Sequence, residues 1–198
     1  VASQLDNMDW THSQVQFNHF ITGDNFDVTT RVYRNDFERA WYKINGFKGG
    51  LVNRSLQEIL ADPDKDEVNS RFYNILTGSQ DSVAEYEKLV LGNNDRTYYS
   101  QGIQSDLNLQ LELFGMQHQF ASGVRFHQDQ IERNHTTDTY LMTQANLVSD
   151  GSDTQAATTD REKTDAWSVY LQDTISISAL DITAGVRGEY IDAHYQNR

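Results

Sequence analysis

The chain contains no cysteine and a single proline, Pro63, among its 198 residues. Without cysteine there is no disulfide, no thiolate metal site and no cysteine nucleophile. Proline cannot donate a hydrogen bond to a neighbouring strand, so a chain with almost none suits a protein built mainly of strands.

Positive charge and long apolar runs are also scarce. The net charge is −13, which argues against a nucleic-acid partner because phosphate backbones need a basic face. No segment approaches the roughly 20 consecutive apolar residues of a membrane-spanning helix. A hydrophobic content of 37% is nevertheless compatible with a transmembrane β-barrel, since only every second strand residue must face lipid.

Catalytic motifs are missing as well. The sequence has no P-loop, no glycine-rich dinucleotide motif, no nucleophile elbow and no zincin motif, so we expect neither an enzyme nor a cofactor. Asp62, Asp64 and Asp66 have the first three spacings of a calcium-binding EF-hand loop. Glu67 then stands where that loop needs Gly, and Tyr73 where it needs Glu, so we interpret the segment as a helix-capping loop without a metal site.

What the sequence does contain is a long alternation of apolar and polar residues. In residues 103–113 apolar residues occupy every second position, with Ser105 as the one exception. Residues 118–130 repeat the pattern, with Val124 and Phe126 on the apolar side. A period of two is typical of strands, and these runs exceed the roughly 5–6 residues of an average strand.

The pattern predicts about six strands in three antiparallel hairpins. The predicted strands cover residues 11–20, 26–44, 96–113, 118–133, 166–177 and 180–193. Turns within a hairpin are short, whereas the connections between hairpins are long. This asymmetry is typical of an outer-membrane β-barrel, so the expected fold class is all-β with short helices in one long loop.

The two long connections differ in character. Residues 46–95 are predicted to form a long helical loop, in which Ser55, Asp66 and Asp81 can each cap a short helix. Residues 134–165 are predicted to form a long polar loop with little regular structure, because no period is visible there.

Four stretches of the predicted strands carry a family resemblance. Residues 8–12 (MDWTH), 27–43 (DVTTRVYRNDFERAWYK), 166–173 (AWSVYLQD) and 182–192 (ITAGVRGEYID) resemble the barrel of TonB-dependent outer-membrane receptors. They look most like the branch that includes ferric dicitrate and ferric siderophore receptors. The two long connections lie outside the resemblance.

The resemblance implies a receptor of the bacterial outer membrane that binds and imports an iron chelate. Its partners would be the chelate, the TonB complex and outer-membrane lipid. We find no plug domain, no TonB box and no signal peptide, and six strands are few beside the about 22 of a plugged barrel. Residues 1–198 are therefore expected to be a single segment, or fragment, of such a barrel.

Four residues on the polar side of the predicted strands are candidate ligand contacts: Arg39, Arg125, His127 and Arg187. Guanidinium groups bind carboxylates through paired hydrogen bonds, which suits an anionic chelate. The alternative, which the sequence favours, is that the arginines pair with acidic residues on neighbouring strands, since both long connections are net acidic and would not attract anions. The acidic neighbours are Asp106, Glu112, Asp129 and Glu189. For His127 the alternative is an ordinary solvated face.

Aromatic residues gather towards the ends of the predicted strands. In a membrane barrel they would form the interfacial girdle, whereas in a soluble protein they would reflect ordinary strand propensity. The residues are Trp10, Tyr33, Phe37, Trp41, Tyr42, Tyr98, Tyr99, Trp167, Tyr190 and Tyr195.

The apolar side separates two fold hypotheses. A barrel turns Leu107, Leu109 and Val124 towards lipid, whereas a soluble all-β ligand- or carbohydrate-binding module buries them between two sheets. Left in water, each such side chain forfeits roughly 1.5–3 kcal/mol. We therefore expect the isolated chain to hide this face by self-association, by binding detergent, or by covering it with the helices of residues 46–95.

Overall fold

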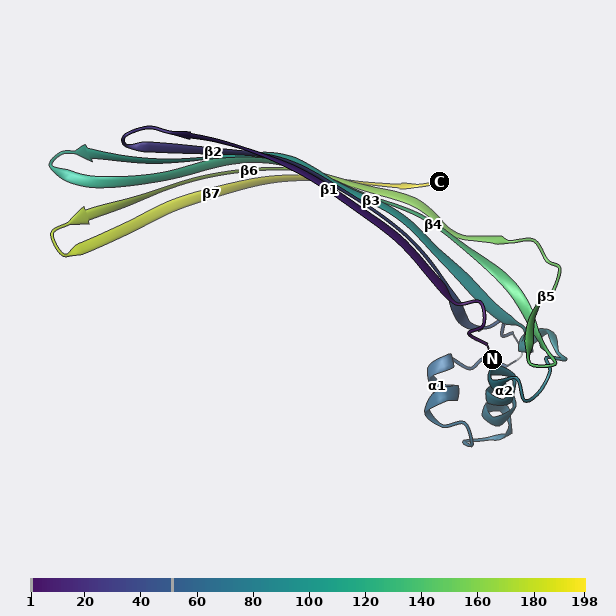
Figure 1. Cartoon of the computed structure of the whole chain (residues 1–198). Coiled ribbons are helices and arrows are strands. Elements are labelled where there is room, and N and C mark those ends of the chain that lie inside the picture. Colours follow the sequence, from purple (N-terminus) through teal and green to yellow (C-terminus); the bar gives the residue numbers. More distant parts are fainter. Residues whose placement is uncertain (1, 51) are drawn as a thin grey trace. The chain divides into compact units, whose positions relative to one another are not determined.

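The computed structural model describes residues 2–50 and 52–198, and Figure 1 labels their helices and strands. The strands are β1 (Asn7–Thr22), β2 (Phe26–Phe47), β3 (Leu89–Leu113), β4 (Met116–Thr143), β5 (Asn146–Ser149), β6 (Gln155–Ile177) and β7 (Leu180–Asn197). The helices are α1 (Leu56–Ala61), α2 (Glu67–Thr77) and the short 3-10 helix η1 (Glu85–Glu87). Among the described residues, no helix is long and apolar enough to cross a membrane.

The strands form one seven-stranded sheet in the order β1-β2-β3-β4-β6-β7, with β5 paired to β4. Apart from β5, strands that follow one another in the chain are neighbours in the sheet, and the three predicted antiparallel hairpins are confirmed. The prediction of six strands missed the short β5. The path of the sheet ends at β1 and at β7.

Two-residue turns join β3 to β4, β4 to β5, and β6 to β7. Phe114 (φ 53°) and Gly115 (φ 76°) connect β3 to β4, and Gln144 (φ 49°) and Ala145 (φ 62°) connect β4 to β5. Two successive residues with positive φ form the turn whose twist matches that of paired strands. Ser178 begins the equally short link from β6 to β7, as the sequence predicts.

The chain divides into two compact units. The first unit comprises residues 1–11, 38–96 and 133–160, and the second comprises residues 12–37, 97–132 and 161–198. Five strands, β1, β2, β3, β4 and β6, contribute residues to both units, whereas β7 lies within the second.

The first unit contains a closed apolar core between its helices and its strand residues. Phe72 of α2 is 1% exposed, and its ring lies 4.3 Å from the ring of Phe47, measured between centroids. The other buried apolar side chains are Ala2, Ile59, Ile75, Leu76, Leu89, Leu91 and Met142. The N-terminal residues lie beside α2 (Figure 1), where the Ala2 amide donates to the Leu76 carbonyl at 2.8 Å.

Helix caps form where the sequence predicts them. Ser55 and Glu58 make a capping box at the start of α1, and the Asp66 side chain accepts from the Asn69 amide at the start of α2. Gly78 ends α2 in the left-handed conformation (φ 79°). Asp66 therefore serves as a helix cap, as the helix-capping interpretation of this acidic segment predicts.

A buried carboxylate fixes the segment between α2 and β3. Glu87 is 4% exposed and accepts hydrogen bonds from the Arg71 guanidinium at 2.8 and 3.0 Å. The amides of Val83 and Ala84 donate to the same carboxylate at 2.7 and 3.0 Å. Together these donors lower the pKa of Glu87 to about 2, although burial of the carboxyl group opposes the shift.

The predicted third helix, capped by Asp81, is wrong. Between Asp81 and Leu89, where the structure describes every residue, only the three residues of η1 are helical, and β3 begins at Leu89. Leu89 and Leu91 both point into the core, because alternate residues of a strand share one face. The predicted helical loop 46–95 is therefore shorter at both ends, since β2 continues to Phe47.

The predicted polar loop 134–165 is also wrong. β4 continues to Thr143, β5 follows, and β6 begins at Gln155, so most of this segment is strand. Polar residues occupy both faces here, which removes the apolar alternation by which strands are recognised. The β-branched threonines of this segment fit a strand even without that alternation.

In the second unit the strands present two unlike faces. Phe126 and Trp167 share one face, where their ring centroids lie 4.8 Å apart, whereas Arg125 and His127 share the other with Tyr33. We call these the apolar face and the polar face. The apolar face carries Ile103, Leu107, Leu109, Leu111, Leu113, Phe120, Val124, Phe126, Trp167, Val169, Leu171, Ile175, Ile177, Leu180, Ile182, Val186 and Tyr190.

Within the second unit, several large side chains of the apolar face are exposed. Helix α2 packs against Leu89, Leu91 and Met142 of its own unit, and covering of the apolar face by the helices stays a prediction. Among the described residues no second sheet lies against the apolar face, and Ile103 and Val124 stay 47% and 46% exposed. The two-sheet sandwich that the sequence left open is therefore not the fold.

Candidate ligand-binding site

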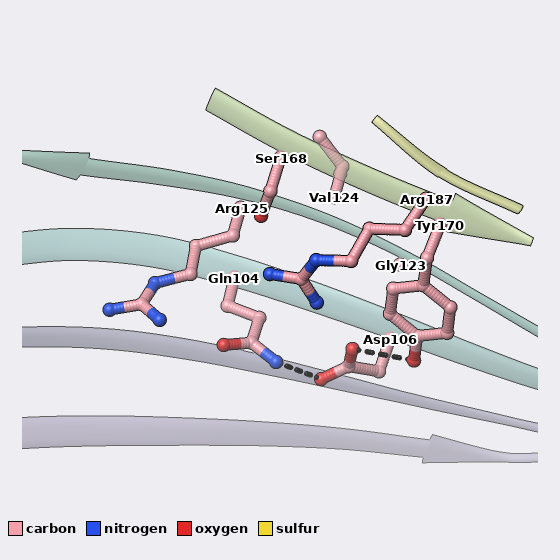
Figure 2. Close-up of a pocket in the computed structure, with 8 residues that line it drawn as sticks. All are labelled: Gln104, Asp106, Gly123, Val124, Arg125, Ser168, Tyr170 and Arg187. Atoms are coloured by element: carbon pink, nitrogen blue, oxygen red, sulfur yellow. Dashed lines mark hydrogen bonds between the residues drawn. The ribbon is translucent and has the colours of Figure 1, made fainter. Parts of the chain in front are cut away.

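Two shallow depressions on the polar face of the second unit bring three of the four predicted residues together. Arg125 and Arg187 line both depressions, and His127 lines one of them. Figure 2 shows the two arginines on the same side of the strands as Gln104, Asp106 and Tyr170. Arg39 lines neither depression and belongs to the first unit.

Arg125 is held by hydrogen bonds to neutral groups. Its Nη2 donates to the Tyr33 hydroxyl at 2.8 Å and lies 3.2 Å from His127 Nδ1. The Tyr33 hydroxyl lies 2.6 Å from the same nitrogen, so Nδ1 is an acceptor and the ring proton is on Nε2. His127 Nε2 faces the Asp129 carboxylate at 3.5 Å. The Arg125 Nε is buried without a hydrogen-bond partner.

Asp106 and Tyr170 close the other side of the site. The Tyr170 hydroxyl donates to Asp106 Oδ1 at 3.1 Å, and Gln104 Nε2 donates to Asp106 Oδ2 at 2.9 Å (Figure 2). The Tyr170 ring lies over Gly123, where an added Cβ would come within 2.4 Å of it. Gly102 likewise leaves room for the Tyr33 hydroxyl, which would lie 2.6 Å from a Cβ. Two glycines thus admit the two tyrosines that border the site.

The arginines differ in how they are paired. Arg187 donates to Glu189 Oε1 at 2.9 and 2.5 Å, so it pairs with an acidic residue of its own strand and not, as expected, with one on a neighbouring strand. Asp106 and Asp129, which were expected to pair with arginines, instead contact Tyr170 and His127. Among the described residues, no carboxylate is within hydrogen-bond distance of Arg125, whose contacts are Tyr33 and His127.

A second basic cluster lies in the first unit around His135. Arg96 Nε donates to His135 Nε2 at 3.0 Å, which requires a neutral ring, and the charges of Arg39 and Arg133 act on the same ring. Arg133 forms an ion pair with Asp160 at 3.0 Å, and Asp160 is 4% exposed. Arg39 lies over Trp41, with 5.9 Å from its guanidinium carbon to the ring centroid.

No group of three or more His, Asp or Glu side chains within residues 2–50 and 52–198 is arranged to hold a metal ion. The donors of both clusters are guanidinium, hydroxyl and amide groups. They suit an oxyanion rather than a cation.

Comparisons with known proteins agree on the fold. Residues 2–198 match the protein family described as TonB dependent receptor-like, beta-barrel. The chain belongs to the TonB-dependent receptor family.

Solved receptors of this kind share the strand arrangement at low sequence identity. The ferric citrate transporter FecA, in its unliganded form, superposes with a TM-score of 0.60 at 16% identity, over 97% of this chain and 22% of that one. The ferric-catecholate import receptor Fiu from E. coli K12 superposes with a TM-score of 0.57 at 14% identity, over 98% of this chain and 27% of that one. The ferric preacinetobactin receptor BauA from Acinetobacter baumannii superposes with a TM-score of 0.54 at 11% identity, over 95% of this chain and 25% of that one. No curated protein sequence matches the chain.

The TonB-dependent receptor chain thus spans about a quarter of the length of these solved receptors, at 22–27%. At such identities the likeness establishes the fold. The family is one of transport receptors and not of enzymes.

Sequence reasoning missed several residues of both clusters. Tyr33 was assigned to an aromatic girdle, yet it bonds Arg125 and His127 across a separation of more than ninety positions. Arg96 and Arg133 were not singled out, because nothing local distinguishes them from other strand arginines. The register between strands was the missing signal, since directly opposed residues of antiparallel strands share a face.

Proposed function

We propose that this chain forms part of the wall of an outer-membrane receptor that binds an anionic iron chelate and imports it together with the TonB complex. The observation that carries the proposal is the surroundings of Arg125, a cation on the polar face of a TonB-dependent barrel sheet. It contacts hydroxyl and imidazole groups and, in the part of the chain that the structure describes, no carboxylate. Such a guanidinium is free to accept an oxyanion.

The residues then take different roles. Arg125 and Arg187 are the proposed ligand contacts, while Tyr33 and His127 position the Arg125 side chain. In the first unit, Arg39 is proposed to contribute to the charge that draws the chelate inward. Residues 46–95 carry the helices and are proposed to face the medium, because long connections lie on the outer side of such barrels.

The test is uptake of radiolabelled iron by cells that carry the receptor. Ferric citrate and a ferric catecholate serve as probes. We expect Arg125→Gln to weaken binding of the transported probe by roughly tenfold to a hundredfold, as loss of a charged hydrogen bond of about 1.5–3 kcal/mol predicts.

Arg34→Gln is the matched control. Arg34 is also a strand arginine, but it pairs with Asp36 at 2.6 Å and contacts Gln101 on the opposite face. It should leave uptake unchanged. If the Arg125→Gln variant takes up each probe as well as the parent receptor does, the proposed ligand contact is refuted.

A further inference from the structure

The Asp106 carboxylate is held by two uncharged donors that come from different strands. Gln104 of the same strand donates to Oδ2 at 2.9 Å, and the Tyr170 hydroxyl donates to Oδ1 at 3.1 Å. Asp106 belongs to β3 and Tyr170 to β6, and β4 runs between these two strands. Neighbouring strands lie about 4.8 Å apart, so the Tyr170 side chain spans most of the roughly 10 Å between β6 and β3.

Gly123 of β4 makes this crossing possible. A Cβ at position 123 would lie within 2.5 Å of both the Tyr170 ring and Asp106 Oδ1, so both partners of the hydrogen bond lie directly on the glycine. Glycine inside a strand often marks such a close approach. A larger residue at this position would push the ring and the carboxylate apart, while the backbone of β4 could stay as it is, since only side-chain atoms would be displaced.

In the part of the chain that the structure describes, two arginines line the same depression as this carboxylate without pairing with it. They are Arg125 and Arg187, and Figure 2 shows the Arg187 side chain extending over the strands towards Gln104 and Asp106. Arg187 bonds Glu189 through Nε and Nη2. Because a guanidinium group carries five N–H donors, each arginine keeps donors for an oxyanion. A carboxylate in the same depression is the direct competitor for those donors.

We infer that Tyr170 is a positioning residue of the ligand site. Its hydroxyl, held over Gly123, fixes the Asp106 carboxylate with a donor that carries no charge. Arg125 and Arg187 then keep their remaining N–H donors for an oxyanion of the ligand. A carboxylate released by Tyr170 would pair with one of these guanidinium groups, and the ligand would have to displace it. The inference rests on the ligand contacts in the proposed function and adds the residue that keeps them open.

Binding to variants of the full receptor tests the inference. The probe is ferric citrate or a ferric catecholate, whichever the parent receptor binds. Tyr170→Phe should weaken binding roughly twofold to fivefold, since the ligand must then displace an exposed ion pair. Asp106→Asn should abolish this effect, so that Tyr170→Phe changes nothing in an Asp106→Asn background. A loss of the same size in both backgrounds would mean that Tyr170 only supports the fold, and would overturn the inference.

Gly123→Ala gives an independent route to the same change. It keeps the Tyr170 hydroxyl but displaces the ring and the carboxylate, so it should weaken binding as Tyr170→Phe does, and again only while Asp106 is present. Gly188→Ala is the matched control, because a Cβ there would meet Val169 at an ordinary 3.8 Å. It should leave binding unchanged. Binding that Gly123→Ala leaves at the value of the parent would contradict the inference.

Labelling of the arginines separates this inference from the proposed function. Phenylglyoxal modifies unpaired guanidinium groups, and mass spectrometry of the digested receptor follows Arg125 and Arg187 separately. With no iron probe present, Tyr170→Phe should slow the modification of one of them about twofold or more, and Asp106→Asn should restore the rate. A receptor that binds neither probe but shows this change would disprove the proposed function and leave the role of Tyr170 intact. Unchanged modification of both arginines would refute that role, even in a receptor that imports a probe.

Discussion

The two units of this chain bury apolar side chains in opposite ways. Every buried apolar residue among those described belongs to the first unit, where Ile59, Phe72 and Ile75 are at most 1% exposed. The second unit has an equally apolar face, yet Trp167 and Val186 there are 53% and 70% exposed. The first unit therefore excludes water with its own helices. The second needs an outside partner, since burial of such side chains is the main favourable term in folding.

The largest effect we predict lies in the core of the first unit. Phe72→Ala should destabilise that unit by about 3–5 kcal/mol, because it leaves a cavity among fully buried neighbours. Pulse proteolysis of the receptor across a urea series, followed at residues 46–95, measures the change. Leu60→Ala is the control, since Leu60 is 59% exposed and its truncation should hardly move the midpoint. Equal midpoints for both variants would mean that the helices are not held by this core.

Acid should weaken the first unit through Glu87. Its pKa is lowered from 4.5 to about 2, so the folded state favours the charged carboxylate. The stabilisation, roughly 3 kcal/mol, is present above pH 4.5 and is lost as the pH falls towards 2. The urea midpoint at pH 7, 4.5 and 3 should fall in the parent and fall much less in Glu87→Gln. Glu67→Gln, in the first turn of α2, should keep the dependence of the parent. A parent midpoint that does not change with pH would contradict the assigned role of Glu87.

In the second unit, the His118–Asp173 pair should matter only as a pair. Asp173→Val leaves His118 without its partner in the apolar face and should cost about 1–3 kcal/mol. The double variant, His118→Leu with Asp173→Val, should regain most of this loss, because replacing both partners leaves no unsatisfied group. Reversible unfolding in phosphatidylcholine vesicles supplies the three free energies. Additive losses from the two substitutions would show that the residues do not interact.

The smallest effect concerns a helix cap. Ser55→Ala removes the hydroxyl that accepts from the Glu58 amide at 3.2 Å, and should cost about 1 kcal/mol. Ser55→Thr keeps the hydroxyl and should cost much less. Hydrogen exchange at the amides of α1 resolves the difference. Unchanged protection in Ser55→Ala would mean that tertiary packing alone holds this helix.

Local patterns in the sequence predicted the elements whose causes are local. Ser55, Asp66 and Gly78 mark the ends of α1 and α2, because caps depend on residues within one turn of the helix. Alternation over residues 103–113 predicted β3 because one face was apolar and the other polar. The same rule failed at residues 134–165, where both faces are polar and the pairing of strands decides the structure.

The sequence by itself determined the alternating parts of the long strands, the short turns and the two capped helices, since each depends on neighbouring residues. It also determined that one side of the strands is apolar and the other polar. Only the tertiary structure decided which side chains contact one another across strands, such as Tyr33 with Arg125. It also decided that Arg39 lies in a different unit from Arg187. Those meetings depend on the register between strands, which hydrogen bonds across the whole sheet set together.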